Sequence, residues 1–233
     1  MKGFIFFLTG LLYLFSFYSC STIKSGNKAV DFQRIESVIS NPDTNLYYPS
    51  LMKRLKEKDT TLTKNDFHHL YYGYVFQDEY SKLSIPKRED EYIELMKKPV
   101  LLPEDTLKVL NICEDMVAEF PFFSLKYYSM LSYFYGLTGN KDLENYYGLL
   151  VWKFYEAILS TGSGNTDEEP TYVIYIRNEY DILALDGLQM TSQALTQKGQ
   201  DCISLAPNKH NIDRLYFDVN ITFSQGMRNF RKK

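Results

Sequence analysis

Tyrosine is the residue type that gives this sequence its clearest means of binding a ligand. The chain of 233 residues contains 20 tyrosines and 16 phenylalanines but a single tryptophan. An aromatic face can stack on a sugar or hold a peptide, and the tyrosine hydroxyl adds a polar tip to an apolar ring. Two groups of tyrosines are centred on Tyr71 and Tyr72 and on Tyr127 and Tyr128. We predict that these four side chains form a binding surface; the alternative, that such rings fill the interfaces between helices, stays open.

Catalytic chemistry has weaker support in the sequence. The acidic run 89–91 follows Lys87 and Arg88, a pattern typical of a charged surface. Ser163 does not lie in a Gly-x-Ser-x-Gly elbow, and its glycine-containing loop lacks the lysine of a phosphate-binding loop. A glycoside hydrolase would need two carboxylates about 5–10 Å apart across a cleft. The alternative interpretation is an envelope hydrolase that acts on glycan or cell-wall substrates, with carboxylates from separate helices.

The cysteines and histidines do not show the spacing of a metal site. Cys113 lies on an apolar helical face and Cys202 in a strand-like segment, so we expect two free thiols, although an oxidising compartment would also permit a disulfide. His68 and His69 are adjacent, and on a helix they would point about 100° apart, which prevents both from holding one ion. The sequence therefore predicts no metal and no cofactor.

The first 20 residues are typical of an exported lipoprotein. Lys2 precedes an apolar run from Phe4 to Phe17, which is shorter than the roughly 20 residues of a membrane-spanning helix. Residues 17–20 read Phe-Tyr-Ser-Cys, which resembles the lipobox of lipoprotein signal peptidase, although the leucine and one small residue of that motif are replaced. We expect residues 1–19 to be a signal peptide and Cys20 to be the acylated first residue of the mature protein.

The residues after Cys20 suggest where the protein is held. Residues 20–30 are mostly polar and form a predicted flexible tether. By analogy with lipoproteins of enteric bacteria, serine rather than aspartate at position 21 favours the outer membrane. By analogy with surface-exposed lipoproteins of Bacteroides-type bacteria, the lack of acidic residues in 21–30 favours the periplasmic side. The expected partners are the membrane, through the lipid anchor, and an envelope protein or glycan.

The charge of the mature chain argues against nucleic-acid binding. The full sequence has 26 basic and 29 acidic side chains, and residues 1–19 contain one lysine and no acid, which leaves 25 basic against 29 acidic, a net charge of −4. Proteins that bind nucleic acid usually show a basic excess or stripe. We therefore expect no nucleic-acid partner.

The order of the predicted elements indicates an α+β fold. Apolar residues recur with helical periodicity over 31–160, and Thr63 with Asp66 forms a predicted capping box. A polar, glycine-containing break at 160–170 precedes a part rich in strands, which ends with Leu215, Phe217 and Val219 alternating with polar residues. The predicted helices are 31–39, 48–58, 63–77, about 86–98, 103–119, 122–137, 141–160 and 177–185. The predicted strands are 171–176, 188–197, 200–205 and 214–223, the last three forming an antiparallel meander. We expect the helical part (31–160) and the C-terminal part (161–233) to form one cooperative unit.

Two resemblances add to this reading. The helix pair 122–160 is similar to a degenerate tetratricopeptide hairpin, with large residues at Tyr127, Met130, Phe134 and Tyr147, but with leucines where that family has small residues. More broadly, the chain resembles an uncharacterised lipoprotein family of Bacteroides-type bacteria, described as domain of unknown function 4919. The stretches that carry this resemblance are 59–63, 70–73, 157–162, 179–183 and 215–219. The resemblance implies the fold and no activity.

The same resemblance implies a modification. Bacteroides-type bacteria O-glycosylate exported proteins at an aspartate followed by serine or threonine and a small or aliphatic residue. Asp59-Thr60-Thr61 and Asp105-Thr106-Leu107 fit this pattern, so Thr60 and Thr106 are the predicted acceptors. Taken together, the sequence favours a membrane-tethered periplasmic lipoprotein that acts as a non-enzymatic binding or scaffold module.

Overall fold

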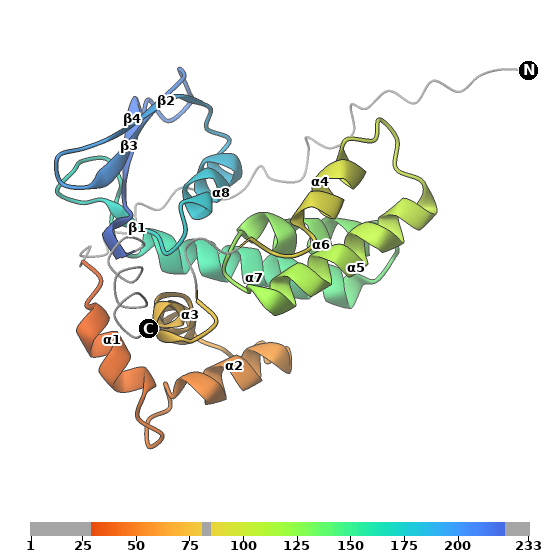
Figure 1. Ribbon diagram of the computed structural model, residues 1–233, viewed down its shortest axis with the longest axis horizontal. Coiled ribbons are helices and arrows are strands. Elements are labelled where there is room, and N and C mark those ends of the chain that lie inside the picture. Colours follow the sequence, from red (N-terminus) through yellow and green to blue (C-terminus); the bar gives the residue numbers. More distant parts are fainter. Residues whose placement is uncertain (1–28, 81–84, 222–233) are drawn as a thin grey trace, which may run out of the picture.

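The fold has a layer of packed helices with a small sheet at one side, as Figure 1 shows. The structure is a computed structural model, and it describes residues 29–80 and 85–221. The predicted signal peptide, Cys20 and most of the tether lie outside the described residues. The helices are α1 (Phe32–Ile39), α2 (Tyr48–Lys56), α3 (Lys64–Gly73), the short 3-10 helix η1 (Tyr74–Phe76), α4 (Glu89–Met96), α5 (Pro103–Glu119), α6 (Leu125–Leu137), α7 (Lys141–Leu159) and α8 (Arg177–Asp186).

Local signals in the sequence set several of these helix ends. The predicted capping box is confirmed: the Asp66 backbone N–H donates to the Thr63 hydroxyl at 3.2 Å, and the Thr63 N–H donates to the Asp66 carboxylate at 2.8 Å. Gly139, after α6, and Gly187, after α8, have φ angles of +81° and +65°. Glycine adopts this left-handed conformation at little cost, so both positions end a helix.

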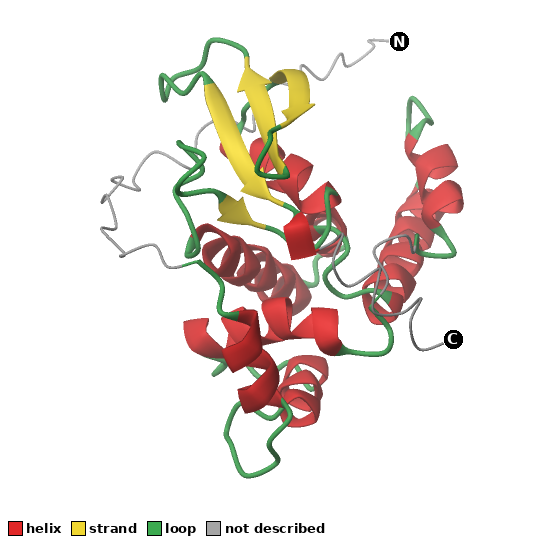
Figure 2. Ribbon diagram, turned by 60° about the vertical axis from the view of Figure 1, so that its left-hand side comes forward, coloured by secondary structure: helices red, strands yellow, loops and turns green. Residues whose placement is uncertain are grey.

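The sheet contains the predicted meander and one pairing that the sequence did not indicate. Its strands β1 (Thr171–Tyr172), β2 (Met190–Leu195), β3 (Gln200–Leu205) and β4 (Arg214–Asp218) lie in the order β1-β4-β3-β2. The pairs β2–β3 and β3–β4 are antiparallel, as expected, and β1 is parallel to β4. Figure 2 shows the sheet at the upper end of the molecule, above most of the helices. β2 is an edge strand of this sheet.

The first predicted strand, 171–176, is much shorter in the structure, for a reason that lies in another part of the chain. The Val173 N–H still donates to the Asp218 carbonyl, in β4, at 3.1 Å. The backbone then leaves the sheet, and the Ile174 N–H donates to the hydroxyl of Tyr71, on α3, at 3.2 Å. The Ile174 carbonyl in turn accepts from the Tyr80 hydroxyl at 2.7 Å. Because side chains of the helical part satisfy these backbone groups, the segment needs no strand partner.

One apolar core runs through both parts of the chain. It includes Leu51, Leu70 and Phe154 from the helices, and Ile203 and Phe217 from the sheet, all nearly or fully buried. The expected division at residue 160 is thus a change of secondary structure within one packed body.

Candidate functional site

The prediction that Tyr71, Tyr72, Tyr127 and Tyr128 form a binding surface is wrong. Tyr71 and Tyr72 are 0% exposed, Tyr127 is 1% and Tyr128 is 4% exposed. The reason is that α3 packs against α1, α2 and α7, and α6 packs against α5 and α7, so each helix is enclosed on more than one face. The alternative interpretation, rings that fill interfaces between helices, is the one that the structure supports.

The buried tyrosines have a structural role instead, because their hydroxyls join the helical part to the C-terminal part. The Tyr71 hydroxyl donates to Asn178, at the start of α8, at 2.7 Å. The Tyr72 hydroxyl donates to the Tyr172 carbonyl, in β1, at 2.9 Å. Burial raises the pKa of both hydroxyls, so they stay protonated and keep these bonds throughout the physiological range.

The described cysteines and histidines form no metal-binding group. Cys113 is buried in α5 and Cys202 is partly buried in β3, and both are free thiols. Burial raises the pKa of Cys113 to about 12 and lowers that of His68 to about 4. Within residues 29–80 and 85–221, no group of three histidine, cysteine or acidic side chains is arranged to hold a metal ion.

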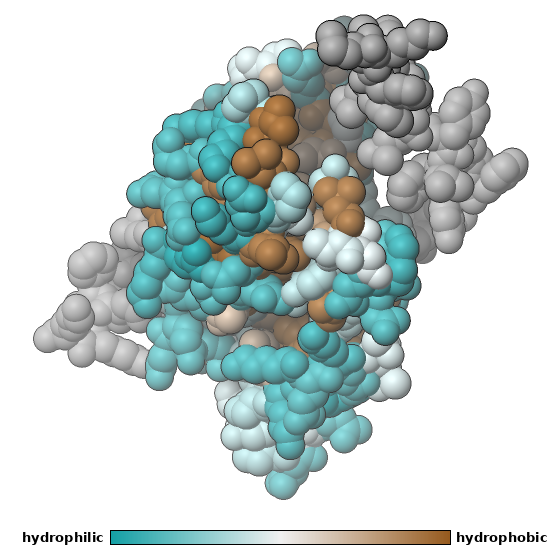
Figure 3. All heavy atoms as spheres, turned by 90° about the vertical axis from the view of Figure 1, so that its right-hand side faces the viewer, coloured by the Kyte–Doolittle hydropathy of each residue, from teal (hydrophilic) through white to brown (hydrophobic). Residues whose placement is uncertain are grey.

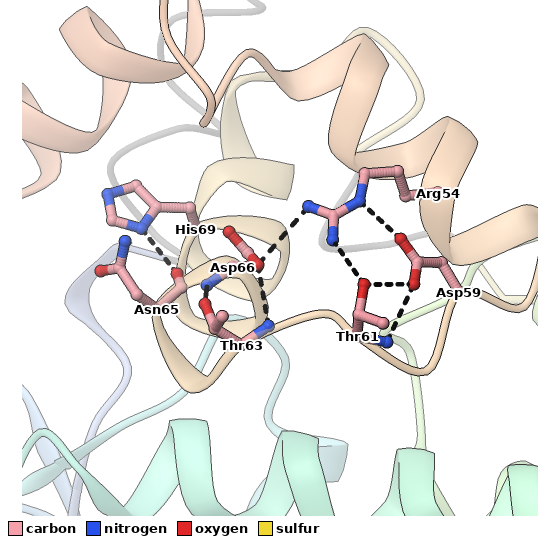
Figure 4. A network of polar contacts seen from close by, with 7 residues as sticks. All are labelled: Arg54, Asp59, Thr61, Thr63, Asn65, Asp66 and His69. Carbon is pink, nitrogen blue, oxygen red and sulfur yellow. Dashed lines mark hydrogen bonds and ion pairs between the residues drawn. The ribbon is translucent and has the colours of Figure 1, made fainter.

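A polar network surrounds the first predicted glycosylation motif (Figure 4). Arg54, at the end of α2, donates to Asp59 at 2.7 Å and lies 3.6 Å from Asp66, on α3. The Asp59 carboxylate also accepts from the backbone and hydroxyl of Thr61 at 2.8 and 2.6 Å. These bonds lower the pKa of Asp59 to about 2, with the Thr61 hydroxyl and Arg54 as the main causes. The network holds a defined turn that leaves Thr60 exposed.

The same network forms one wall of an open polar hollow of about 480 Å³ between α2 and the start of α3. The lining residues are Thr44, Asn45, Ser50, Arg54, Thr63 and Asp66. Two of these residues, Arg54 and Asp66, join α2 to α3, and Thr63 caps α3. The second motif differs, because Thr106 is partly buried in the first turn of α5. O-glycosylation of Thr60 and Thr106 stays a prediction, which intact mass before and after Thr60→Ala and Thr106→Ala would test.

Two carboxyl groups meet where α8 packs on the sheet. Glu179, on α8, is 0% exposed, and the Gln193 side chain links it to Asp201, on β3. The Gln193 amide, from β2, donates to Asp201 at 2.8 Å and to Glu179 at 3.3 Å, and the Tyr180 hydroxyl donates to Gln193 at 2.5 Å. Burial, and then the Asp201 charge and hydrogen bond, raise the pKa of Glu179 to about 9. Glu179 is therefore protonated at neutral pH.

This carboxyl pair does not have the geometry of a glycoside hydrolase. The Gln193 amide is bonded to both groups, whereas glycosidases keep the space between their carboxylates open for a sugar or a water. A Glu179 side chain with no exposed surface also has no access to a large substrate. The pair instead fastens α8 to β2 and β3. Glu179 lies in one of the stretches that carry the family resemblance, but its partners come from strands that the sequence could not place beside it.

Exposed apolar side chains are concentrated on the tip formed by α4, α5 and the segments beside them. Val100 is 69% exposed and Leu107 is 63% exposed. We call this surface the α4–α5 tip; its residues are Ile85, Ile93, Met96, Val100, Leu102 and Leu107. Figure 3, which looks onto this end of the molecule, shows apolar residues gathered among hydrophilic ones. In the sequence, the signal for it was the apolar run of residues 100–102 between Pro99 and Pro103.

These features define an α+β protein in which helices and a small mixed sheet share one core. A family model described as a domain of unknown function (DUF4919) matches residues 33–228, and the chain belongs to this family. No curated protein and no solved structure matches the chain. The helices α6 and α7 pair as predicted, and their resemblance to a tetratricopeptide hairpin stays a prediction.

Proposed function

We propose that this protein is a lipid-anchored, non-enzymatic binding module on the periplasmic side of the outer membrane, and that it binds an envelope protein. The observation that carries the proposal is the α4–α5 tip, where six large apolar side chains on and beside two packed helices are exposed. Contiguous exposed apolar surface that is rimmed by polar residues marks interaction sites in soluble domains. Burying such side chains against a partner is favourable by about 25 cal/mol per Å² of apolar surface.

The composition of the tip favours a protein partner over a glycan. Its six residues are isoleucine, leucine, valine and methionine, whereas sugars stack on aromatic rings. Two ion pairs lie beside it: Lys97 with Glu94 at 2.6 Å, and Lys98 with Asp105 at 2.7 Å. An apolar centre with a polar rim of nearly balanced charge is the usual composition of a protein–protein interface.

The anchor is a second part of the proposal. In residues 29–80 and 85–221, no helix combines the length and the apolar character needed to cross a bilayer. In the proposal, Cys20 attaches the protein to the membrane, and a flexible tether joins it to the folded body. Incorporation of labelled palmitate that is lost in Cys20→Ala tests this part separately from the partner.

The partner is tested by photo-crosslinking of the full-length protein in its host. A photoreactive amino acid is placed at Val100 or Leu107, and at Leu137 as a matched control, because Leu137 is 61% exposed on α6 and Leu107 is 63% exposed. We expect one envelope protein to crosslink from the tip positions and not from Leu137. The double variant Val100→Ser/Leu107→Ser should lose this partner, as measured by native co-purification, while Leu137→Ser keeps it.

The opposite results would refute the binding-module proposal. One such result is equal crosslinking from Val100, Leu107 and Leu137. Another is a partner that still co-purifies with the double variant. A thermal melt of the double variant, which changes only exposed side chains, shows whether it is folded.

A further inference from the structure

We infer that the outer edge of β2 accepts a short extended segment of a partner polypeptide as an added strand. β2 stands at the end of the order β1-β4-β3-β2, so only β3 pairs with it among the described strands. An unpaired strand edge presents a row of backbone N–H and C=O groups, which is the surface that strand addition uses. This site is independent of the α4–α5 tip, which lies at the other side of the molecule (Figure 1).

The hydrogen-bond register shows which backbone groups are available. The Thr196 N–H donates to the Gln200 carbonyl at 2.8 Å, and β2 and β3 are paired in register from Ser192 to Leu195. In an antiparallel ladder, residues alternate between bonding to the neighbouring strand and pointing away from it. Because Thr196 bonds to β3, Ala194 also bonds to β3, and Gln193 and Leu195 direct their N–H and C=O groups to the free edge.

β2 has few of the features that normally protect an edge strand. All six of its residues are exposed, and none of them is charged or a proline. Natural sheets usually shield an edge with lysine, proline, a bulge or a covering segment. The irregularity in the ladder lies at one end, between Met190 and Ser192, and leaves the stretch up to Leu195 regular. An unshielded edge of this kind is suited to pairing with another strand.

Apolar side chains next to this edge indicate which segment it would take. Tyr180, on α8, is 39% exposed. Tyr180 is joined to β2 through its 2.5 Å bond to Gln193, and Leu195 is 63% exposed. Side chains alternate between the two faces of a strand, so every second residue of an added strand would face α8. The segment should therefore carry apolar side chains at alternate positions.

A peptide segment fits this edge better than a second copy of the chain. Six residues of strand are about 20 Å long, and two such edges bury far less than the roughly 800 Å² per partner of a stable interface. A short peptide needs only a few backbone bonds and the apolar contacts with α8, which suits a weak, reversible complex. Dimerisation through β2 is accordingly one of the results that would overturn the inference.

The test selects peptides on the full-length protein, purified in detergent from its host membranes. The probe is a displayed library of random 12-residue peptides, with binding measured by fluorescence anisotropy and mapped by hydrogen–deuterium exchange. We expect selected peptides with alternating apolar residues that slow exchange at residues 190–195. Leu195→Pro removes an outward N–H and should lower affinity at least tenfold.

Three controls keep the test decisive. Leu195→Lys should weaken binding by placing a charge at the edge without changing the backbone, so it serves if Leu195→Pro fails to fold. Leu137→Lys, at a comparably exposed position, should bind as the wild type does. The tip variant Val100→Ser/Leu107→Ser should also retain the peptide, which separates this site from the proposed function. Four results would each overturn the inference. The selection could recover no peptide, or the peptides could fail to protect residues 190–195. Both Leu195 variants could bind peptide with the affinity of the wild type, or the protein could form a dimer that those variants lose.

Discussion

Replacing Glu179 by glutamine should remove a pH dependence from the stability of this protein. The Glu179 carboxyl is fully buried, shares the Gln193 amide with Asp201, and has a pKa of about 9 in the folded protein. In the unfolded chain a glutamate has a pKa of about 4.3. Between these values the folded state holds a proton that the unfolded state has released. The contribution of Glu179 to stability is therefore complete below about pH 4.3 and is lost as the pH rises towards 9.

The size of the effect follows from linkage. One proton difference between the folded and unfolded states changes the free energy of unfolding by about 1.4 kcal/mol per pH unit. From pH 6 to pH 8, within the window, Glu179 should lower the stability of the wild type by about 2.7 kcal/mol. A glutamine has nearly the same shape as a protonated glutamate and can donate to Asp201, but it does not titrate. Glu179→Gln should thus lack this loss and be the more stable protein at pH 8.

Urea unfolding at pH 6, 7 and 8 measures this difference directly. The stabilities of the wild type and Glu179→Gln are subtracted at each pH, so that groups common to both cancel. Glu36→Gln is the matched control, because it removes a carboxyl from an exposed position on α1 and leaves the pair intact. A difference between wild type and Glu179→Gln that stays constant from pH 6 to 8 would show that Glu179 is ionised in the folded protein and would refute the reasoning.

Three further predictions test the buried polar groups. Tyr71→Phe should lower the free energy of unfolding in urea by about 2–3 kcal/mol, because it leaves two buried partners without their hydrogen bond. Tyr92→Phe should lower it little, because that buried hydroxyl has no hydrogen-bond partner among the described residues. The imidazole of His68, with a pKa of about 4, stays neutral in the folded state while the unfolded state takes up a proton below about pH 6.5. His68→Gln should therefore weaken the loss of stability from pH 6.5 down to 4; an equal loss in both proteins would contradict the assignment. In the variant Cys20→Ala, native Ellman titration should detect Cys202 and not the buried Cys113, and two thiols should react after unfolding; two fast thiols in this native variant would contradict the burial of Cys113.

Much of the local structure could be predicted because it depends on neighbouring residues. The capping box at Thr63 and Asp66, the proline that begins α5 and the glycine that ends α8 all act within one turn of helix. The strand β3 has the predicted bounds of 200–205, since its pattern and the turn before it are both local. These features, with the order of the elements, were sufficient for the α+β class.

Only the tertiary structure decided which side chains are accessible. Helical periodicity identifies an apolar face, but it does not reveal that α3 is enclosed by three other helices, so Tyr71 and Tyr72 were assigned to a surface when they are buried. The pairing of Glu179 with Asp201, and of β1 with β4, joins residues that are far apart in sequence. Such contacts depend on how whole elements pack, which a pattern confined to one segment does not encode. The sequence by itself therefore determined the elements, their caps and their order, while the three-dimensional packing determined the candidate interaction surfaces, the α4–α5 tip and the open edge of β2.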